Sequence, residues 1–238
     1  MNGESKKGYV ILNGSVAKQV ANILTNKIIE GEYAKGSFLP TEEVLCSDFG
    51  LGRSSVREAI KTLESRGLVR KIQGKGVEII DNSVEATSEM LNITLAYSKT
   101  SLKDLMDFRV SLEMKNVEWA AKNATAEDIA SMQQSLDMMK EENFNSDDFA
   151  AYDYMFHEAI ARASGNGVSL IMIKALQPLL YKQIVYTLDP NFNPEKANHF
   201  HEYIFEAIKE GDSEKAIKAM FEHLCETQRI ISELETKK

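Results

Sequence analysis

Residues 39–76 read LPTEEVLCSDFGLGRSSVREAIKTLESRGLVRKIQGKG, and they follow the order of elements of a winged helix-turn-helix. Thr41 can accept a hydrogen bond from a free amide and so begin a first helix. The FGLG run supplies a turn, and a second helix is predicted from Arg53 until Gly67 ends it. Its apolar residues recur at helical spacing, and the VRKI, QGKG and VEII segments that follow predict a hairpin, the wing.

The first turn of this second helix is basic and rich in hydroxyl groups. Arg53 and Arg57 could reach guanine edges or phosphates in a DNA major groove, and Ser54 and Ser55 could donate to phosphate oxygens. A winged helix can also bind protein, but residues 51–76 carry seven Lys or Arg against two acids, which favours DNA. In the predicted wing, the residues expected to approach the DNA backbone or the minor groove are Lys71, Gln73, Gly74 and Lys75.

Charge divides the chain into two parts. Residues 1–80 carry 12 basic and 9 acidic side chains, whereas the remainder carries 16 and 27. We therefore expect a DNA-binding domain over 1–80, a polar linker over 81–89 and a second domain over 90–238 that avoids DNA. The run SVAKQVANILTNKIIEGEYAKG, residues 15–36, is predicted to add the first helix of the DNA-binding domain.

The second domain reads as helices throughout, because apolar residues recur three and four apart and strand-like alternation is absent. The predicted helices cover residues 84–98, 101–123, 126–142, 147–163, 167–188, 194–210 and 213–235. Short connections between helices of similar length favour an antiparallel bundle. The expected fold class is mainly α, with an N-terminal winged helix-turn-helix and a C-terminal all-α antiparallel helical bundle.

Cysteine content and hydropathy indicate the compartment. Cys46 and Cys225 provide no disulfide framework, and the chain has no run of about 18 apolar residues that could span a membrane. The sequence does not begin with the apolar run of a signal peptide. We expect a cytoplasmic protein without a membrane partner.

The four histidines carry the most distinctive chemistry of the second domain. Asp153 and His157 are four residues apart on one predicted helix, so both project from the same face. His201 and His223 lie on two later helices, and a tight EGD turn near residue 211 would bring them to similar heights. One carboxylate and three imidazoles would make a site for a divalent metal, zinc above all, with nickel or manganese as alternatives. Hydrogen-bonded core histidines remain an equal explanation from spacing alone.

Open positions on such a metal would attract a small carboxylate. Arg109, in DFRVSLE, could be a second clamp, because a guanidinium binds a carboxylate through two parallel hydrogen bonds. A surface ion pair, for instance with Glu113 four residues later, is the alternative for Arg109. The fourth histidine, His199, is expected on a different face of its helix from His201, towards solvent.

Two parts of the chain resemble known families. The 39–76 stretch resembles the DNA-binding domain of the GntR family of bacterial transcription regulators, in which an LP…GLSR…VREAL…L…GL…R…G.G run recurs. The segments LKDLMDFRVSLE, DYMFHEAIARASGN, HEYIFEAIKEGD and MFEHL resemble the FCD domain, the helical effector-binding domain of the FadR subfamily. Glu43 and Gly52 depart from the family, where many relatives carry a basic residue and Ser or Thr, and this implies an operator unlike the commonest family sites.

The resemblance implies roles for individual residues. Metal-binding FCD domains hold their ion with an Asp-x-x-x-His pair and two later histidines, which match Asp153, His157, His201 and His223. Arg109 matches an arginine often used for ligands, and Asn166 matches a frequent asparagine whose alternative role is helix capping. The effector implied is a small organic, sugar or amino-acid carboxylate.

These features together predict a ligand-responsive transcription regulator, a repressor, and not an enzyme. It would bind a near-palindromic double-stranded DNA operator as a homodimer, and the carboxylate at the metal would change its affinity for DNA. Three alternatives stay open: a metal-dependent hydrolase or oxygenase with an incidental winged domain, a metal-free regulator of the acyl-CoA type, and a structural DNA-bridging protein.

Overall fold

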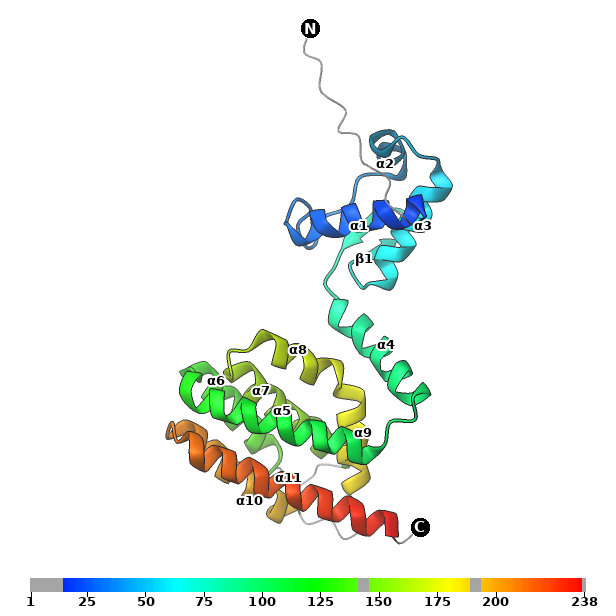
Figure 1. Cartoon of the computed structure of the whole chain (residues 1–238). Coiled ribbons are helices and arrows are strands. Elements are labelled where there is room, and N and C mark those ends of the chain that lie inside the picture. Colours follow the sequence, from blue (N-terminus) through cyan, green and yellow to red (C-terminus); the bar gives the residue numbers. More distant parts are fainter. Residues whose placement is uncertain (1–14, 141–145, 189–193, 237–238) are drawn as a thin grey trace. The chain divides into compact units, whose positions relative to one another are not determined.

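The computed structural model describes residues 15–140, 146–188 and 194–236, and it divides the chain into two compact units, Met1–Thr87 and Ser88–Lys238. Apart from one two-stranded sheet, the regular elements of the described residues are helices (Figure 1). The expected fold class is therefore confirmed. No single helix in these ranges has both the length and the apolar composition to cross a membrane.

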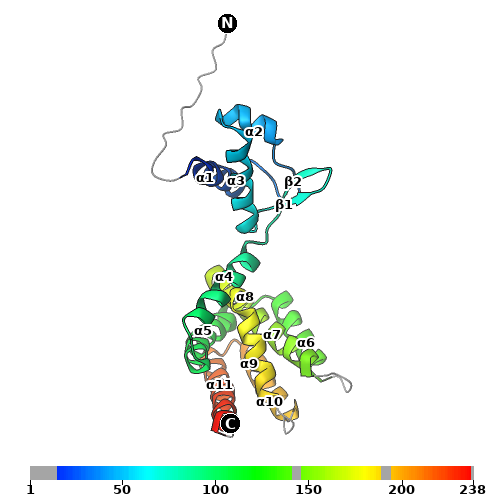
Figure 2. The ribbon, with the colours of Figure 1, turned by 90° about the vertical axis from the view of Figure 1, so that its right-hand side faces the viewer.

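The first unit is a winged helix-turn-helix (Figure 2). Its elements are α1 (Val16–Ile29), α2 (Glu42–Phe49), α3 (Arg53–Ser65), β1 (Val69–Ile72) and β2 (Gly76–Ile79). The two strands are antiparallel, with Val69 opposite Ile79, and they form the wing. One apolar core joins all five elements, and its fully buried members include Leu24, Leu45, Val56, Leu63 and Ile79.

Local sequence sets the ends of the helices in this unit. The hydroxyl of Thr41 accepts from the amide of Val44 at 3.3 Å and begins α2, as predicted, and Gly50 ends that helix at φ +65°. Gly67 follows α3 at φ +69°, and an added Cβ there would lie 2.2 Å from the carbonyl oxygen of Asn82. Both the left-handed backbone and the close approach restrict this position to glycine.

The second unit is a bundle of helices. Its elements are α4 (Ser83–Tyr97, which begins in the first unit), α5 (Leu102–Asn123), α6 (Ala126–Met138), α7 (Ser146–Ala163), α8 (Gly167–Ala175), α9 (Gln177–Thr187), α10 (Pro194–Lys209) and α11 (Ser213–Thr236). Helix α11 packs against α5 and α10, and α7 packs against α5, α6 and α9. A tight turn with Gly211 at φ +74° joins α10 to α11. Most of the stretch expected as a linker, 81–89, is helical because α4 begins at Ser83.

The prediction of one continuous helix over 167–188 is wrong. Two helices, α8 and α9, cover this stretch and are bent by 61° at the break between them. Pro178 lies in the first turn of α9. Proline lacks an amide hydrogen and is tolerated there, but in a helix interior it removes a hydrogen bond and clashes with the preceding turn. The end expected for another helix, at residues 141 and 142, lies outside the described residues.

Candidate metal centre and DNA-binding surface

The residues predicted to bind in the major groove lie in the first two turns of α3. Arg53, Ser54 and Arg57 are exposed, and Ser55 is half-buried. Gly52 precedes the helix and provides no side-chain cap. The first amides of α3 therefore lack the side-chain acceptor that Thr41 gives to α2. Free amides at a helix N-terminus can donate hydrogen bonds to a phosphate.

The wing residues are also exposed. Lys71 lies in β1, and Gln73, Gly74 and Lys75 form the turn that leads into β2. Gly74 has φ +75°, which favours glycine in this turn. The wing thus presents two lysines and a tight backbone turn to solvent.

An ion pair across the helix-turn-helix was not foreseen from the sequence. Arg57 Nε donates to Glu42 Oε2 at 2.7 Å, which links α3 to α2. The neighbouring Glu43, which differs from the family pattern, is exposed. Glu42 therefore orients one of the two arginines predicted to contact DNA. The spacing of these residues in the sequence does not reveal the ion pair, because it depends on how closely α2 and α3 approach each other.

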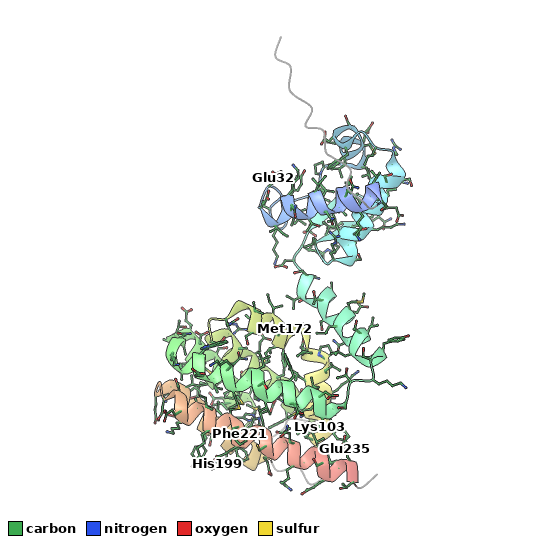
Figure 3. All side chains as sticks on the ribbon, viewed as in Figure 1. Glu32, Lys103, Met172, His199, Phe221 and Glu235 are labelled. Atoms are coloured by element: carbon green, nitrogen blue, oxygen red, sulfur yellow. The ribbon has the colours of Figure 1, made fainter. Side chains whose placement is uncertain are left out.

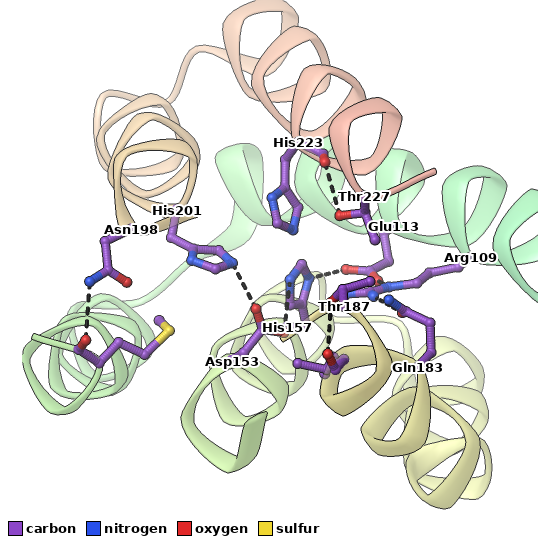
Figure 4. Close-up of polar contacts among 12 residues, drawn as sticks. Arg109, Glu113, Asp153, His157, Gln183, Thr187, Asn198, His201, His223 and Thr227 are labelled. Atoms are coloured by element: carbon purple, nitrogen blue, oxygen red, sulfur yellow. Dashed lines mark hydrogen bonds and ion pairs between the residues drawn. The ribbon is translucent and has the colours of Figure 1, made fainter. Parts of the chain in front are cut away.

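Four buried side chains gather in the second unit. Asp153 and His157 come from successive turns of α7, His201 from α10 and His223 from α11, and one potential ligand atom of each lies within 4.8 Å of the others (Figure 4). None of the four is more than 7% exposed. The rings of His201 and His223 are closest, with centroids 4.6 Å apart. The turn at Gly211 folds α11 back along α10, which explains why these two histidines meet.

The chemistry of this cluster fits a divalent cation. Among the described residues, no hydrogen-bond partner exists for Asp153 Oδ2, for His157 Nε2 or for either ring nitrogen of His201. His201 Nε2 lies 3.1 Å from Asp153 Oδ1, within ion-pair distance but outside hydrogen-bond geometry. Buried polar atoms without partners are destabilising. One oxygen and three nitrogen donors are the ligand types of zinc and nickel, so the cluster could hold such an ion.

Electrostatics keeps two of these groups in a form that can coordinate. Burial raises the pKa of Asp153, but the close approach and charge of His201, followed by the charge of His157, outweigh it and hold that pKa well below its usual range. Burial, and then the charges of His201 and His157, lower the pKa of His223 well below that of an ordinary histidine. A carboxylate and a neutral imidazole are the forms that bind metals.

A buried carboxylate beside the cluster was missed as a site residue. Glu113, on α5, accepts from Arg109 Nε at 2.5 Å and also contacts Nδ1 of His157. Arg109 Nη1 donates to Gln183 Oε1 at 2.5 Å. Burial raises the pKa of Glu113, but the charges of His157 and Arg109 and their hydrogen bonds lower it to about 2. The ion pair with Glu113 that the sequence left as the alternative for Arg109 is therefore present, but it is buried and does not lie at the surface as expected.

Two polar residues named from the sequence lie outside the cluster. Asn166 Oδ1 accepts from the amide of Ser169 at 3.1 Å and caps α8, so its side chain has the capping role and is not gathered with the four donors. The ligand-binding role given to Asn166 stays a prediction, whereas its capping role is confirmed. His199 is exposed on α10 and meets the ring of Tyr203 edge-on, as its solvent-facing prediction requires (Figure 3).

Comparison with known proteins identifies both units. Residues 104–225, half of the chain, match the FCD domain, and residues 16–79 match the bacterial regulatory proteins of the gntR family. The chain is 27% identical over 210 residues to the HTH-type transcriptional regulator LutR of Bacillus subtilis, covering 86% of this chain and 96% of the relative. It is 25% identical over 218 residues to the galactonate operon transcriptional repressor of Escherichia coli, covering 89% and 94%.

A solved structure agrees with this fold. The Streptococcus agalactiae GntR structure superposes with a TM-score of 0.72 at 24% identity, over 90% of this chain and 99% of that one. The relatives are named as regulators of transcription and not as enzymes. These two domain matches and the named relatives show that the protein belongs to the GntR family of bacterial transcription regulators and has an FCD domain in its C-terminal half.

Proposed function

We propose that the chain is a repressor whose winged unit binds operator DNA and whose helical unit senses a small carboxylate at a divalent metal. The observation that carries this proposal is the buried cluster of Asp153, His157, His201 and His223, with ligand atoms within 4.8 Å of one another. Zinc suits one carboxylate and three imidazoles best, and nickel or manganese are alternatives. When bound, the ion would supply the positive charge that attracts an anionic effector.

A carboxylate is the effector class that the surrounding charge favours. Arg109 lies in the same buried region as the four donors, and its charge acts on Asp153 and on His223. We assign to it a second contact with the effector, made beside its ion pair with Glu113. The galactonate operon repressor, one of the relatives, is named after a sugar carboxylate. A small organic or sugar acid is therefore the effector proposed here, with an amino acid as the third class.

DNA recognition is assigned to residues 1–80, and sensing and dimerisation to residues 90–238, which follow the stretch 81–89 expected as a linker. Arg53 and Arg57 would reach base edges or phosphates, and Ser54 and Ser55 would donate to phosphates. A homodimer would present two α3 helices to the half-sites of a near-palindromic operator. The effector changes DNA affinity only if it binds the two arrangements of the dimer unequally. The wing residues assigned to the DNA backbone or minor groove are Lys71, Gln73, Gly74 and Lys75.

Operator affinity measured against a panel of small carboxylates tests this function. We expect one acid to weaken operator binding by roughly 5- to 150-fold, the usual range of coupling between two sites. Removing the metal with a chelator should abolish the response, and restoring zinc should recover it. The His201→Ala variant should bind the operator like wild type but ignore the acid, whereas His199→Ala should respond normally. An effector response that survives complete removal of the metal contradicts the proposed sensor.

A further inference from the structure

We propose that Glu113 is a positioning residue of the metal centre, which fixes the tautomer of His157 so that Nε2 offers its lone pair to the cation. This inference rests on the proposed metal function and adds to it a residue that is not itself a ligand. Glu113 belongs to α5, whereas the four donors belong to α7, α10 and α11. It would act only through the imidazole that it holds.

The two oxygens of Glu113 have separate partners. Oε1 accepts from Arg109 Nε at 2.5 Å, and Oε2 contacts Nδ1 of His157 (Figure 4). The other ring nitrogen, Nε2, lies 3.7 Å from Asp153 Oδ2 and has no hydrogen-bond partner among the described residues. A carboxylate paired with Arg109 can only accept, so Nδ1 of His157 carries a proton and Nε2 is left to face the cation.

Arg109 keeps the Glu113 carboxylate charged and holds it in the orientation that faces His157. Glu113 is 1% exposed and Arg109 is 3% exposed, so water does not weaken their attraction. Gln183, on α9, accepts at Oε1 from Nη1 of Arg109 and so fixes the orientation of the guanidinium. Three side chains in a row, Gln183, Arg109 and Glu113, therefore determine how His157 faces the other donors.

His157 differs in this respect from His201. Neither ring nitrogen of His201 has a hydrogen-bond partner among the residues described. The imidazole of His157 is thus held before any cation arrives, and a ligand held in its binding orientation loses less entropy on coordination. A carboxylate behind a metal-binding histidine has this effect in other proteins, where its loss weakens metal binding by roughly 10- to 100-fold.

The Glu113→Gln variant separates positioning from packing, because glutamine has nearly the same shape. Both partners of Glu113 are donors, but a glutamine side chain has one accepting oxygen and one donating amide group. If Arg109 keeps the oxygen, His157 must accept at Nδ1, and its proton moves to Nε2, which then cannot coordinate. We expect zinc affinity, measured by competition with a chromophoric chelator, to fall by roughly 10- to 100-fold. The matched control is Glu118→Gln on the surface of the same helix, which should bind zinc like wild type.

Nitrogen NMR of the histidine rings, recorded on metal-free protein at pH 8, reads the tautomer directly. Wild type should show the His157 proton on Nδ1, and Glu113→Gln should show it on Nε2, with Glu113→Asp restoring Nδ1 because its carboxylate still accepts. A wild-type proton on Nε2 overturns the proposal, even if the glutamine variant fails to fold. Equal zinc affinity of Glu113→Gln and wild type also overturns it, while the metal centre itself stands. Absence of zinc binding by wild type overturns the proposed function instead.

Discussion

Single residues decide whether the cluster holds a cation, and His201 tests this most directly. It is fully buried, and neither of its ring nitrogens has a hydrogen-bond partner among the described residues. We expect His201→Ala to lose most of its metal in elemental analysis, because three donors remain where four were present. His199→Ala, an exposed histidine on the same helix, should retain the wild-type content. Full stoichiometry in His201→Ala would remove this residue from the ligand set.

Lys75 tests the wing at the same scale. Its side chain is exposed in the turn between β1 and β2. If it neutralises one phosphate, Lys75→Ala should lower the slope of log affinity against log salt concentration by about one unit, because one fewer counterion is released. Lys218→Ala, which removes the same charge from the exposed surface of α11, should leave the slope unchanged. An unaltered slope in both variants would exclude Lys75 from the interface.

The four donors could be found from the sequence because each belongs to a pattern that geometry constrains. Asp153 and His157 are one helical turn apart, and the turn near residue 211 sets the relative heights of His201 and His223. Glu113 could not be found in this way. Its contact with His157 joins residues 44 positions apart on different helices, and only the packing of α5 against α7 brings them together. The roles of the metal ligands themselves stay predictions until the metal is measured.

Among the elements, the junction after α3 gives a sharp prediction. Gly67→Ala should destabilise the winged unit by roughly 1–2 kcal/mol for its left-handed backbone and by roughly 1–3 kcal/mol more for the clash with the carbonyl of Asn82. Gly50→Ala has a similar φ but nothing within 4 Å of the added Cβ, so it should show only the first effect. Urea unfolding followed by far-ultraviolet circular dichroism measures both variants.

The same pair of variants has an internal control. The one tryptophan of the chain, Trp119, lies on α5 in the helical unit. Its fluorescence should report an unchanged unfolding midpoint in Gly67→Ala, because the substitution lies in the other unit. A tryptophan transition that moves together with the dichroism would show that the two units do not unfold separately, and the prediction would then be wrong.

Elements were predicted well where caps and turns are local and poorly where a single residue interrupts a pattern. Thr41, Gly50 and Gly67 mark helix ends by their own chemistry, so the helix-turn-helix could be outlined from the sequence. Apolar spacing continues from residue 167 to 188 across the break between α8 and α9, and spacing alone predicts one helix there. Pro178 is the signal that ends the pattern, because a helix accepts proline only in its first turn.

For the whole molecule, metal binding should stabilise one unit and not the other. The donors all belong to the helical unit, so zinc at about 100 times its dissociation constant should add roughly 2.7 kcal/mol to the unfolding free energy of that unit. The midpoint temperature of thermal unfolding, followed by Trp119 fluorescence, should rise when zinc is added and fall back when a chelator removes it. The His223→Ala variant should show little shift. A zinc-induced shift of equal size in His223→Ala would place the binding elsewhere.

Both halves of the architecture were predictable from composition and charge, whereas the relation between them was not. The basic 1–80 stretch and the acidic remainder are expected to have different partners, and this expectation rests on their charges in the sequence. In the proposed homodimer, the effect of an effector on the winged unit would depend on the second copy and on α4, which begins at Ser83 in the stretch expected as a linker. No periodicity in one chain specifies a dimer.

The distribution of the four donors along the chain has a practical consequence. The first of them, Asp153, comes 65 positions after Ser88, where the second unit begins, and no donor comes from the described residues before Ser88. Fusing residues from Ser88 onward to an unrelated winged domain should therefore yield a chimera that responds to the original inducer but regulates a different promoter. The helical half would then serve as an interchangeable part for engineered gene circuits.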